Sequence, residues 1–155
     1  MNRTVLDRDQ VSYPDVVERL RIALLNSLRL RTQHVRDAVP CEATDEESSR
    51  SKIAILFSGG LDCTILARLC HDILPQNEAI DLLNVAFENP RIHGDLDADE
   101  SPYEKCPDRI TGRSSYAELT TVCPGRRWRL VQVNVPYTET QAHRCCANSN
   151  ASAQY

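Results

Sequence analysis

A pair of glycines between an apolar run and a helix-patterned segment constrains this chain more than any other feature. Residues 53–57 have the length and composition of a short buried strand, and Leu61 begins a segment with apolar residues at helical spacing. Between them, Gly59 and Gly60 let the backbone turn sharply and approach a ligand closely, because glycine has no Cβ. The first amides of the following helix lack partners within it, and the helix dipole favours negative charge there. The stretch therefore predicts a strand, a loop and a helix that together cradle an anion, most simply a phosphate chain.

Known phosphate-binding patterns narrow this prediction. A Walker-type loop requires a lysine after its last glycine, and a dinucleotide fingerprint requires a third glycine further on; this loop has neither. The loop instead resembles the S-G-G-x-D-[ST] signature of ATP pyrophosphatases, with Cys63 where Ser or Thr is usual. In such a loop, Ser58 and the amides of Gly59, Gly60 and Asp62 would hold pyrophosphate, and Asp62 could help to bind a magnesium ion. The simpler alternative is an ordinary glycine turn between a strand and a helix.

The cysteines do not indicate a metal site or a disulfide framework. They lie at positions 41, 63, 70, 106, 123, 145 and 146, form no C-x-x-C pair and are odd in number, so we expect most of them to be free thiols. Cys63 lies at a helix N-terminus, which stabilises a thiolate, so it could act as a nucleophile or redox group. The alternative, which we favour, is that its sulfur replaces a hydroxyl as a weaker donor to phosphate.

Charge and hydropathy exclude some classes of partner. The chain has 155 residues, with 18 basic and 22 acidic side chains and a net charge of −4. Nucleic-acid and membrane-surface proteins usually concentrate basic residues on one face, so we expect neither partner and favour a small-molecule substrate. No run approaches the ~20 apolar residues of a membrane span, and the N-terminal residues lack an apolar targeting core. We therefore expect a cytoplasmic protein.

Composition divides the chain into four parts. They are a helical lead-in (1–37), an acidic flexible linker (38–51), a domain that holds the glycine pair (52–141) and a disordered tail (142–155). In the lead-in, Ser12 is placed to cap a helix that ends near Arg31. The apolar residues of that helix share one face, which predicts a packing helix; they are Val17, Leu20, Leu24, Leu25 and Leu28.

The domain reads as alternating strands and helices. After the helix that begins at Leu61, we expect a second strand at 80–87, a short helix at 113–121 and a third strand at 130–135. A strand, helix and strand in succession form a right-handed parallel unit, and ligands of such sheets lie beyond the carboxyl ends of the strands.

Other charged residues carry weaker signals. Arg109, Arg126 or Arg127 could bind a phosphate or a carboxylate, since guanidinium suits both, although most surface arginines bind neither. The acidic residues at 95–99 invite comparison with a calcium loop, but Glu100 stands where that loop needs glycine. A solvated acidic loop is the better interpretation.

Three segments together resemble a known family. When the glycine loop is joined to residues 80–88 and 107–113, the chain resembles the synthetase domain of the asparagine synthetase domain-containing proteins, over roughly residues 16–143. A cysteine at position 63 also fits variants of that group.

The resemblance implies a partial doubly wound parallel α/β sheet of the adenine nucleotide α-hydrolase (PP-loop) type, with ATP and Mg²⁺ as cofactors. In asparagine synthetases, an aspartate carboxylate attacks the α-phosphorus of ATP, pyrophosphate leaves, and ammonia converts the aspartyl-adenylate to asparagine. By position, Ser58, Gly59, Gly60, Asp62 and Cys63 match the pyrophosphate loop. Two further residues, Leu56 and Val85, match strand positions near the nucleoside.

The chain also departs from that family. Glutamine-dependent members begin with a catalytic cysteine after the initiator methionine, where this chain has Asn2, and a second motif of the form S-G-x-G-A-D-E is not found. We therefore expect an incomplete ligase that does not release ammonia from glutamine and needs a further C-terminal half or a glutaminase domain. The alternatives are a non-catalytic nucleotide-binding or interaction module and, more weakly, an enzyme of tRNA thiolation. A partial sheet would expose an edge and part of an apolar face, which predicts poor solubility or dependence on a partner.

Overall fold

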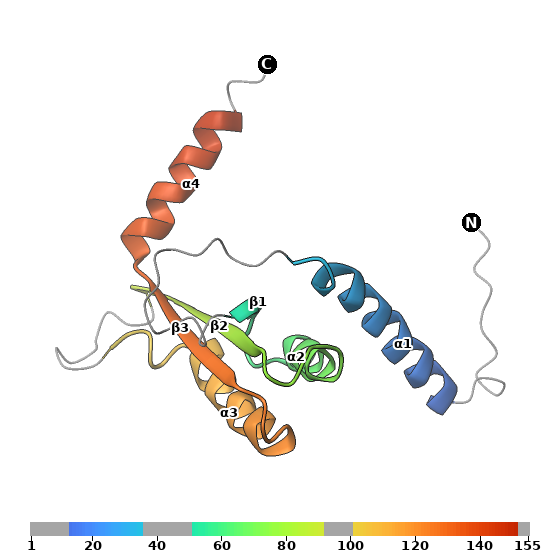
Figure 1. Ribbon diagram of the computed structural model, residues 1–155. Coiled ribbons are helices and arrows are strands. Elements are labelled where there is room, and N and C mark those ends of the chain that lie inside the picture. The colour runs from blue at the N-terminus through green and yellow to red at the C-terminus, as the bar shows by residue number, and fades with distance from the viewer. Residues whose placement is uncertain (1–12, 36–50, 92–100, 152–155) are drawn as a thin grey trace, which may run out of the picture.

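The computed structural model describes residues 13–35, 51–91 and 101–151, with the backbone alone described for residues 145–151 (Figure 1). These residues form four helices and three strands in the order α1 (Tyr13–Thr32), β1 (Ser51–Leu56), α2 (Leu61–Ile73), β2 (Ala79–Phe87), α3 (Pro107–Val122), β3 (Trp128–Val135) and α4 (Tyr137–Ala151). In this part of the chain, no helix is both long and apolar enough to cross a membrane.

The three strands make one parallel sheet in the order β1-β2-β3. Leu83 in β2 is aligned with Leu56 on one side and with Val131 on the other, so the carboxyl ends of all three strands meet at one edge. Each strand is joined to the next by a helix, α2 and then α3. The predicted α/β class with a parallel sheet is therefore confirmed.

Helices α2 and α3 cover the same face of the sheet (Figure 1). Their contact with β2 forms the core, a single cluster of buried side chains made of Phe57, Ala67, Cys70, Ile80, Leu82, Leu119, Cys123 and Trp128. Burial of these eight side chains is the main stabilising contribution, since full burial of a large one such as Phe57, Ile80 or Leu82 is worth roughly 1.5–3 kcal/mol relative to exposure.

The opposite face of the sheet is bare in the described part of the chain. Leu56 is 73% exposed, Phe87 56%, Val131 37% and Val133 38%. Parallel sheets are usually buried on both faces, so an apolar face of this kind is normally covered by a second layer. Helix α4 does not supply that layer, because it runs away from the sheet (Figure 1).

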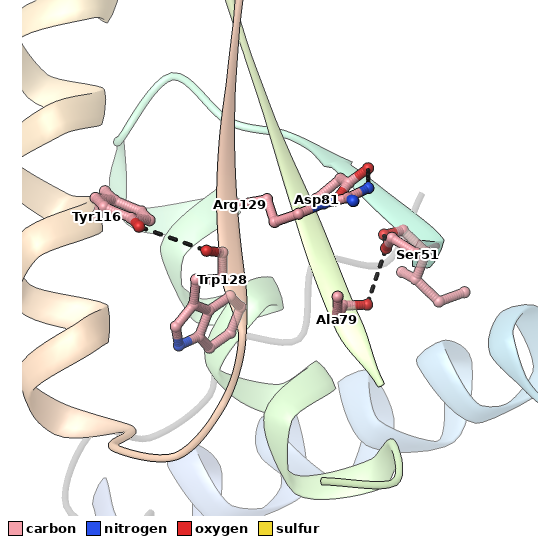
Figure 2. A network of polar contacts seen from close by, with 7 residues as sticks. Ser51, Ala79, Asp81, Tyr116, Trp128 and Arg129 are labelled. Atoms are coloured by element: carbon pink, nitrogen blue, oxygen red, sulfur yellow. Dashed lines mark hydrogen bonds and ion pairs between the residues drawn. The ribbon is translucent and has the colours of Figure 1, made fainter. Parts of the chain in front are cut away.

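Polar contacts tie the sheet together toward the amino ends of β2 and β3 (Figure 2). Arg129 pairs with Asp81 through two contacts of 2.6 and 2.8 Å between neighbouring strands. Ser51 Oγ donates to Ala79 O at 2.8 Å, and the Tyr116 hydroxyl of α3 donates to the carbonyl of Trp128 at 3.4 Å. These bonds fix β1 and α3 to the strands beside them.

Helix α1 matches its predicted bounds closely but uses only part of its apolar face. Leu25 is buried and Leu24 and Leu28 are half-buried, whereas Val17 and Leu20 are exposed. The reason is that α1 packs against α2, which meets only its C-terminal half (Figure 1).

Helix α3 begins earlier than predicted. The sequence predicted a short helix from Arg113 to about Thr121, but the helix begins at Pro107 and includes Gly112, although glycine is disfavoured in a helix interior. Proline suits the first helical position, where its missing N–H would lack a partner anyway. Gly112 is retained inside the helix because a side chain there would strike Asn84: a Cβ atom would lie 2.3 Å from Asn84 Nδ2.

Two further segments differ in part from expectation. Helix α4 continues to Ala151, past residue 142 where the predicted tail begins, and no proline or glycine lies between its ends to interrupt it. The predicted linker lies outside the described residues except for Ser51, the first residue of β1. Ser12, the acidic residues 95–99 and the last four residues of the tail also lie outside them.

Candidate functional site

The glycine loop (residues 57–63) joins β1 to α2 at the carboxyl edge of the sheet. Gly59 has a φ of +84°, in the left-handed region that favours glycine. A Cβ atom at Gly59 would also lie 2.3 Å from the backbone carbonyl of Thr111 in α3. The loop can therefore lie against α3 only because this position has no side chain.

Three consecutive carbonyls of the loop accept hydrogen bonds from side chains outside it. The donors are Asn84 Nδ2 to Phe57 O at 2.8 Å, Thr111 Oγ1 to Ser58 O at 2.6 Å and Ser115 Oγ to Gly59 O at 2.7 Å. Thr111 Oγ1 also lies 2.9 Å from Pro107 O in its own helix, and its single hydrogen is donated to the nearer Ser58 carbonyl. Asn84 lies in β2, and the other two donors lie in α3. The loop carbonyls are therefore turned toward the sheet and α3.

The fourth carbonyl, that of Gly60, is held by the start of α2. It accepts hydrogen bonds from Thr64 Oγ1 at 2.8 Å, from the Thr64 amide at 3.2 Å and from Cys63 Sγ at 3.2 Å. Cys63 Sγ also lies 3.6 Å from Ser58 Oγ. The Cys63 thiol therefore contacts the Gly60 carbonyl and the Ser58 hydroxyl, both of which belong to the loop.

The orientation of these carbonyls determines where the loop amides point. In a planar trans peptide the C=O and the following N–H lie on opposite sides, so inward carbonyls leave the next amides facing outward. The Gly60 amide contacts Ser58 Oγ at 3.3 Å. No side chain caps the N-terminus of α2, and the amides of its first turn have no carbonyl partners within the helix. Successive outward amides at a helix N-terminus attract an anion.

A hollow of about 330 Å³ opens beside the loop. It is lined by Leu56, Phe57, Ser58, Leu83, Val85, Phe87 and Asp108. The predicted nucleoside positions Leu56 and Val85 thus lie in one cavity with Ser58, because the ends of neighbouring parallel strands meet there. Its lining is mostly apolar, with the Ser58 hydroxyl and the Asp108 carboxylate as the polar side chains.

Asp62 is the residue that the sequence predicted to contact magnesium. It lies exposed in the first turn of α2. Among the described residues, no group of three histidine, cysteine or acidic side chains could hold a metal ion. The predicted contact of Asp62 with magnesium therefore stays a prediction.

The three candidate arginines do not surround the loop. Arg126 is buried at the C-terminal end of α2, where it donates to the carbonyls of His71 and Leu74 at 2.9 Å, and it is therefore a structural residue. Arg127 lies beside it, before β3. Arg109 is fully buried in the first turn of α3 and donates to Val133 O at 3.2 Å.

The sequence did not single out the residues that hold the loop from outside. Asn84 carried a signal, since a polar side chain interrupts the apolar strand at 80–87 and is fully buried in the structure. It also donates to Asp108 O at 2.7 Å, which joins β2 to the start of α3. Thr111 and Ser115 carried no signal of their own, because polar residues on a helix are ordinary.

The sheet, the glycine loop and α2 form a parallel α/β unit in which a glycine turn precedes the uncapped N-terminus of a helix. This geometry is typical of anion-binding sites. The chain is 44% identical over 115 residues to an asparagine synthetase domain-containing protein of Drosophila melanogaster, covering 74% of this chain and 18% of that protein. Asparagine synthetase domain-containing protein 1 of Mus musculus is 38% identical over 121 residues, covering 63% and 19%. A relative of the same description in Saccharomyces cerevisiae is 32% identical over 140 residues, covering 86% and 24%.

This chain is therefore a homologue of the asparagine synthetase domain-containing proteins, as the sequence motifs predicted. It spans about a fifth of the length of these relatives. No family model and no solved structure matches it.

Proposed function

We propose that this chain binds ATP with Mg²⁺, with the phosphates on the glycine loop and the nucleoside in the neighbouring hollow. One observation carries the proposal: three successive loop carbonyls are held by donors from β2 and α3, so the amides that follow them point away from the sheet and α3, at the N-terminus of α2. The apolar lining of the hollow suits a purine ring, and the backbone of β2 near Val85 offers groups for its edge. The sheet would then be part of the adenine nucleotide α-hydrolase type.

The reaction that we propose is the one that the relatives' name indicates. An aspartate carboxylate attacks the α-phosphorus of ATP, the bond to pyrophosphate breaks, and ammonia then displaces AMP from the aspartyl-adenylate to give asparagine. The loop amides and Ser58 would hold the negative charge of the leaving pyrophosphate. Asp62 would orient Mg²⁺, which neutralises phosphate charge when it is bound.

Residues beyond this chain are part of the proposal. The chain spans about a fifth of its relatives, and an apolar sheet face lies bare in the described residues. We propose that a further C-terminal half or a separate domain completes the ligase and covers this face. Without it, the chain would bind the nucleotide but complete no reaction.

Isothermal titration of the purified chain with ATP, with and without Mg²⁺, tests the binding proposal. Asp62→Asn should weaken ATP binding about tenfold in Mg²⁺ and should have little effect in EDTA, because the carboxylate acts through the cation. Asp72→Asn is the matched control, since Asp72 is an exposed carboxylate at the other end of the same helix. An absence of ATP binding by the wild-type chain in Mg²⁺ would rule the proposal out.

Release of pyrophosphate with aspartate and ammonia present tests the ligase chemistry. ATP binding without aspartate-dependent release is the result that we expect for this chain alone, and absence of release by a complete homologue as well would indicate a binding module. The same assay on a complete homologue would show whether the missing segments supply the reaction.

A further inference from the structure

The glycine loop is held in place by parts of the chain that follow it at long range. Asn84 binds the Phe57 carbonyl across 27 residues of sequence, Thr111 binds Ser58 across 53, and Ser115 binds Gly59 across 56. We call Asn84, Thr111 and Ser115 the loop clamp. None of them lies between the strand and helix that the loop connects.

The clamp is supported by two close backbone approaches. Gly59 lies against the carbonyl of Thr111, and Gly112 leaves the space that the side chain of Asn84 occupies. Asn84 is fully buried and joins the loop to α3, since its amide nitrogen contacts both Phe57 O and Asp108 O. Helix α3 is therefore joined to the loop directly by Thr111 and Ser115, and indirectly through Asn84.

The three hydrogen bonds decide which face of each loop peptide is outward. If a donor is removed, the carbonyl that it held is left without its partner, and rotation of the peptide toward solvent becomes favourable. That rotation would replace an outward N–H by an outward C=O. For an anion, an attractive group would be exchanged for a repulsive one at the same position.

We propose that the loop clamp sets the anion-binding conformation of the glycine loop, so that Asn84, Thr111 and Ser115 control affinity for the polyphosphate more than for the nucleoside. The inference rests on the proposed function and goes beyond it, because it assigns positioning residues in segments outside the loop. The side chains of the three residues do not line the nucleoside hollow. Phe57 and Ser58, whose carbonyls Asn84 and Thr111 hold, do line it, whereas Gly59, whose carbonyl Ser115 holds, does not. Polyphosphate and nucleoside binding should therefore separate most clearly in a Ser115 variant.

Thr111→Val tests the proposal, because valine keeps the shape of threonine and removes the hydroxyl. Inorganic pyrophosphate, adenosine and ATP, the last with Mg²⁺, are titrated separately against the full chain. Pyrophosphate and ATP binding should weaken about tenfold, as expected for the loss of one well-placed interaction, and adenosine binding should weaken much less. Thr111→Ser, which restores the hydroxyl, should recover most of the loss.

Thr121→Val is the matched control on the same helix, since its hydroxyl donates only within α3, to Ala117 O at 2.9 Å. It should bind all three ligands as the wild type does. Ser115→Ala is a second clamp variant and should reproduce the selective loss of pyrophosphate binding. The proposal would be contradicted if Thr111→Val bound pyrophosphate as tightly as the wild type does. It would also be contradicted if adenosine binding weakened by the same factor as pyrophosphate binding.

Hydrogen exchange at the amides of Gly59, Gly60 and Leu61 separates failure of the clamp from failure of the proposed function. It is measured without ligand. Thr111→Val should change exchange and amide chemical shifts at these positions, and Thr111→Ser should restore them. If the wild type binds no ATP but Thr111→Val changes exchange and chemical shifts at these amides, the proposed function is wrong and the orienting role of the clamp is supported. If Thr111→Val is folded and shows no such changes, the orienting role is wrong.

Discussion

At the scale of single residues, Gly59 is the position at which the site depends most on the absence of a side chain. Its φ of +84° and the 2.3 Å distance from a Cβ to the Thr111 carbonyl impose two separate restrictions. Gly125 has a similar φ of +86° but open space around it. A comparison of substitutions at the two glycines therefore separates the effect of backbone strain, which both positions share, from that of steric conflict, which only Gly59 has.

Gly59→Ala should destabilise the chain by more than about 2 kcal/mol, and Gly125→Ala by only about 1 kcal/mol, because the first adds a backbone clash to the left-handed strain that both share. Urea denaturation followed by circular dichroism measures both. Equal losses in the two variants would mean that the loop does not lie against α3 as described.

At the scale of elements, the C-terminal end of α2 is joined to the start of β3 by His71, Arg126 and Trp128. The His71 ring stacks on Trp128 with centroids 6.3 Å apart, and His71 Nδ1 accepts a hydrogen bond from Arg126 Nε at 3.3 Å. The neutral ring is therefore the form that fits this joint.

Burial lowers the pKa of His71, and the charges of Arg126 and Arg68 lower it further, against an opposing effect of Asp72. Because the folded-state pKa lies below the ordinary value of about 6.5, the unfolded chain takes up the proton more readily as the pH falls. The contribution of His71 to the free energy of unfolding should therefore be constant above pH 7 and should fall between pH 7 and pH 5. His71→Gln, which keeps an acceptor and cannot titrate, should lose less stability over that range in parallel urea titrations.

The secondary-structure elements were largely predictable, and the contacts that make the site were predictable only in part. The three strands and helices α1 and α2 follow hydrophobic periodicity, which is a local property of the sequence. Leu56 and Val85 could be placed together because neighbouring parallel strands end at one edge. Thr111 could not, because the register of α3 against the loop is a property of the folded chain.

The start of α3 was missed for a related reason. The helix was predicted only after Gly112, and local propensity disfavours glycine in a helix interior. In the structure the same residue is needed inside the helix to admit Asn84. Tertiary packing has overridden propensity at a position that also supports the candidate site.

At the scale of the whole molecule, one face of the sheet is covered by α2 and α3, and the other presents apolar side chains among the described residues. Val131 and Val133 belong to this face but not to the lining of the hollow. Substitutions at these two valines can therefore test whether the exposed face drives self-association, without changing the lining of the hollow.

We expect the isolated chain to self-associate in a concentration-dependent manner, and the double variant Val131→Thr/Val133→Thr to weaken that association. Threonine keeps the β-branched shape that suits a strand, and it adds a hydroxyl to the exposed surface. Sedimentation velocity over a range of concentrations measures the change. Val122→Thr is the control, since Val122 is an exposed valine at the end of α3; a wild-type chain that stays monomeric at high concentration would contradict the expectation.

The long sequence separation between the glycine loop and Ser115 has a consequence during synthesis. A ribosome makes the loop at residues 57–63 well before it makes the start of α3, so β1 and α2 can form while the loop carbonyls still lack two of their three outside partners. Nascent chains that end before Pro107 would carry the recognisable glycine motif without Thr111 and Ser115 to orient it. Competence to hold an anion would then arise late in translation, when α3 emerges and packs against a loop made some fifty residues earlier.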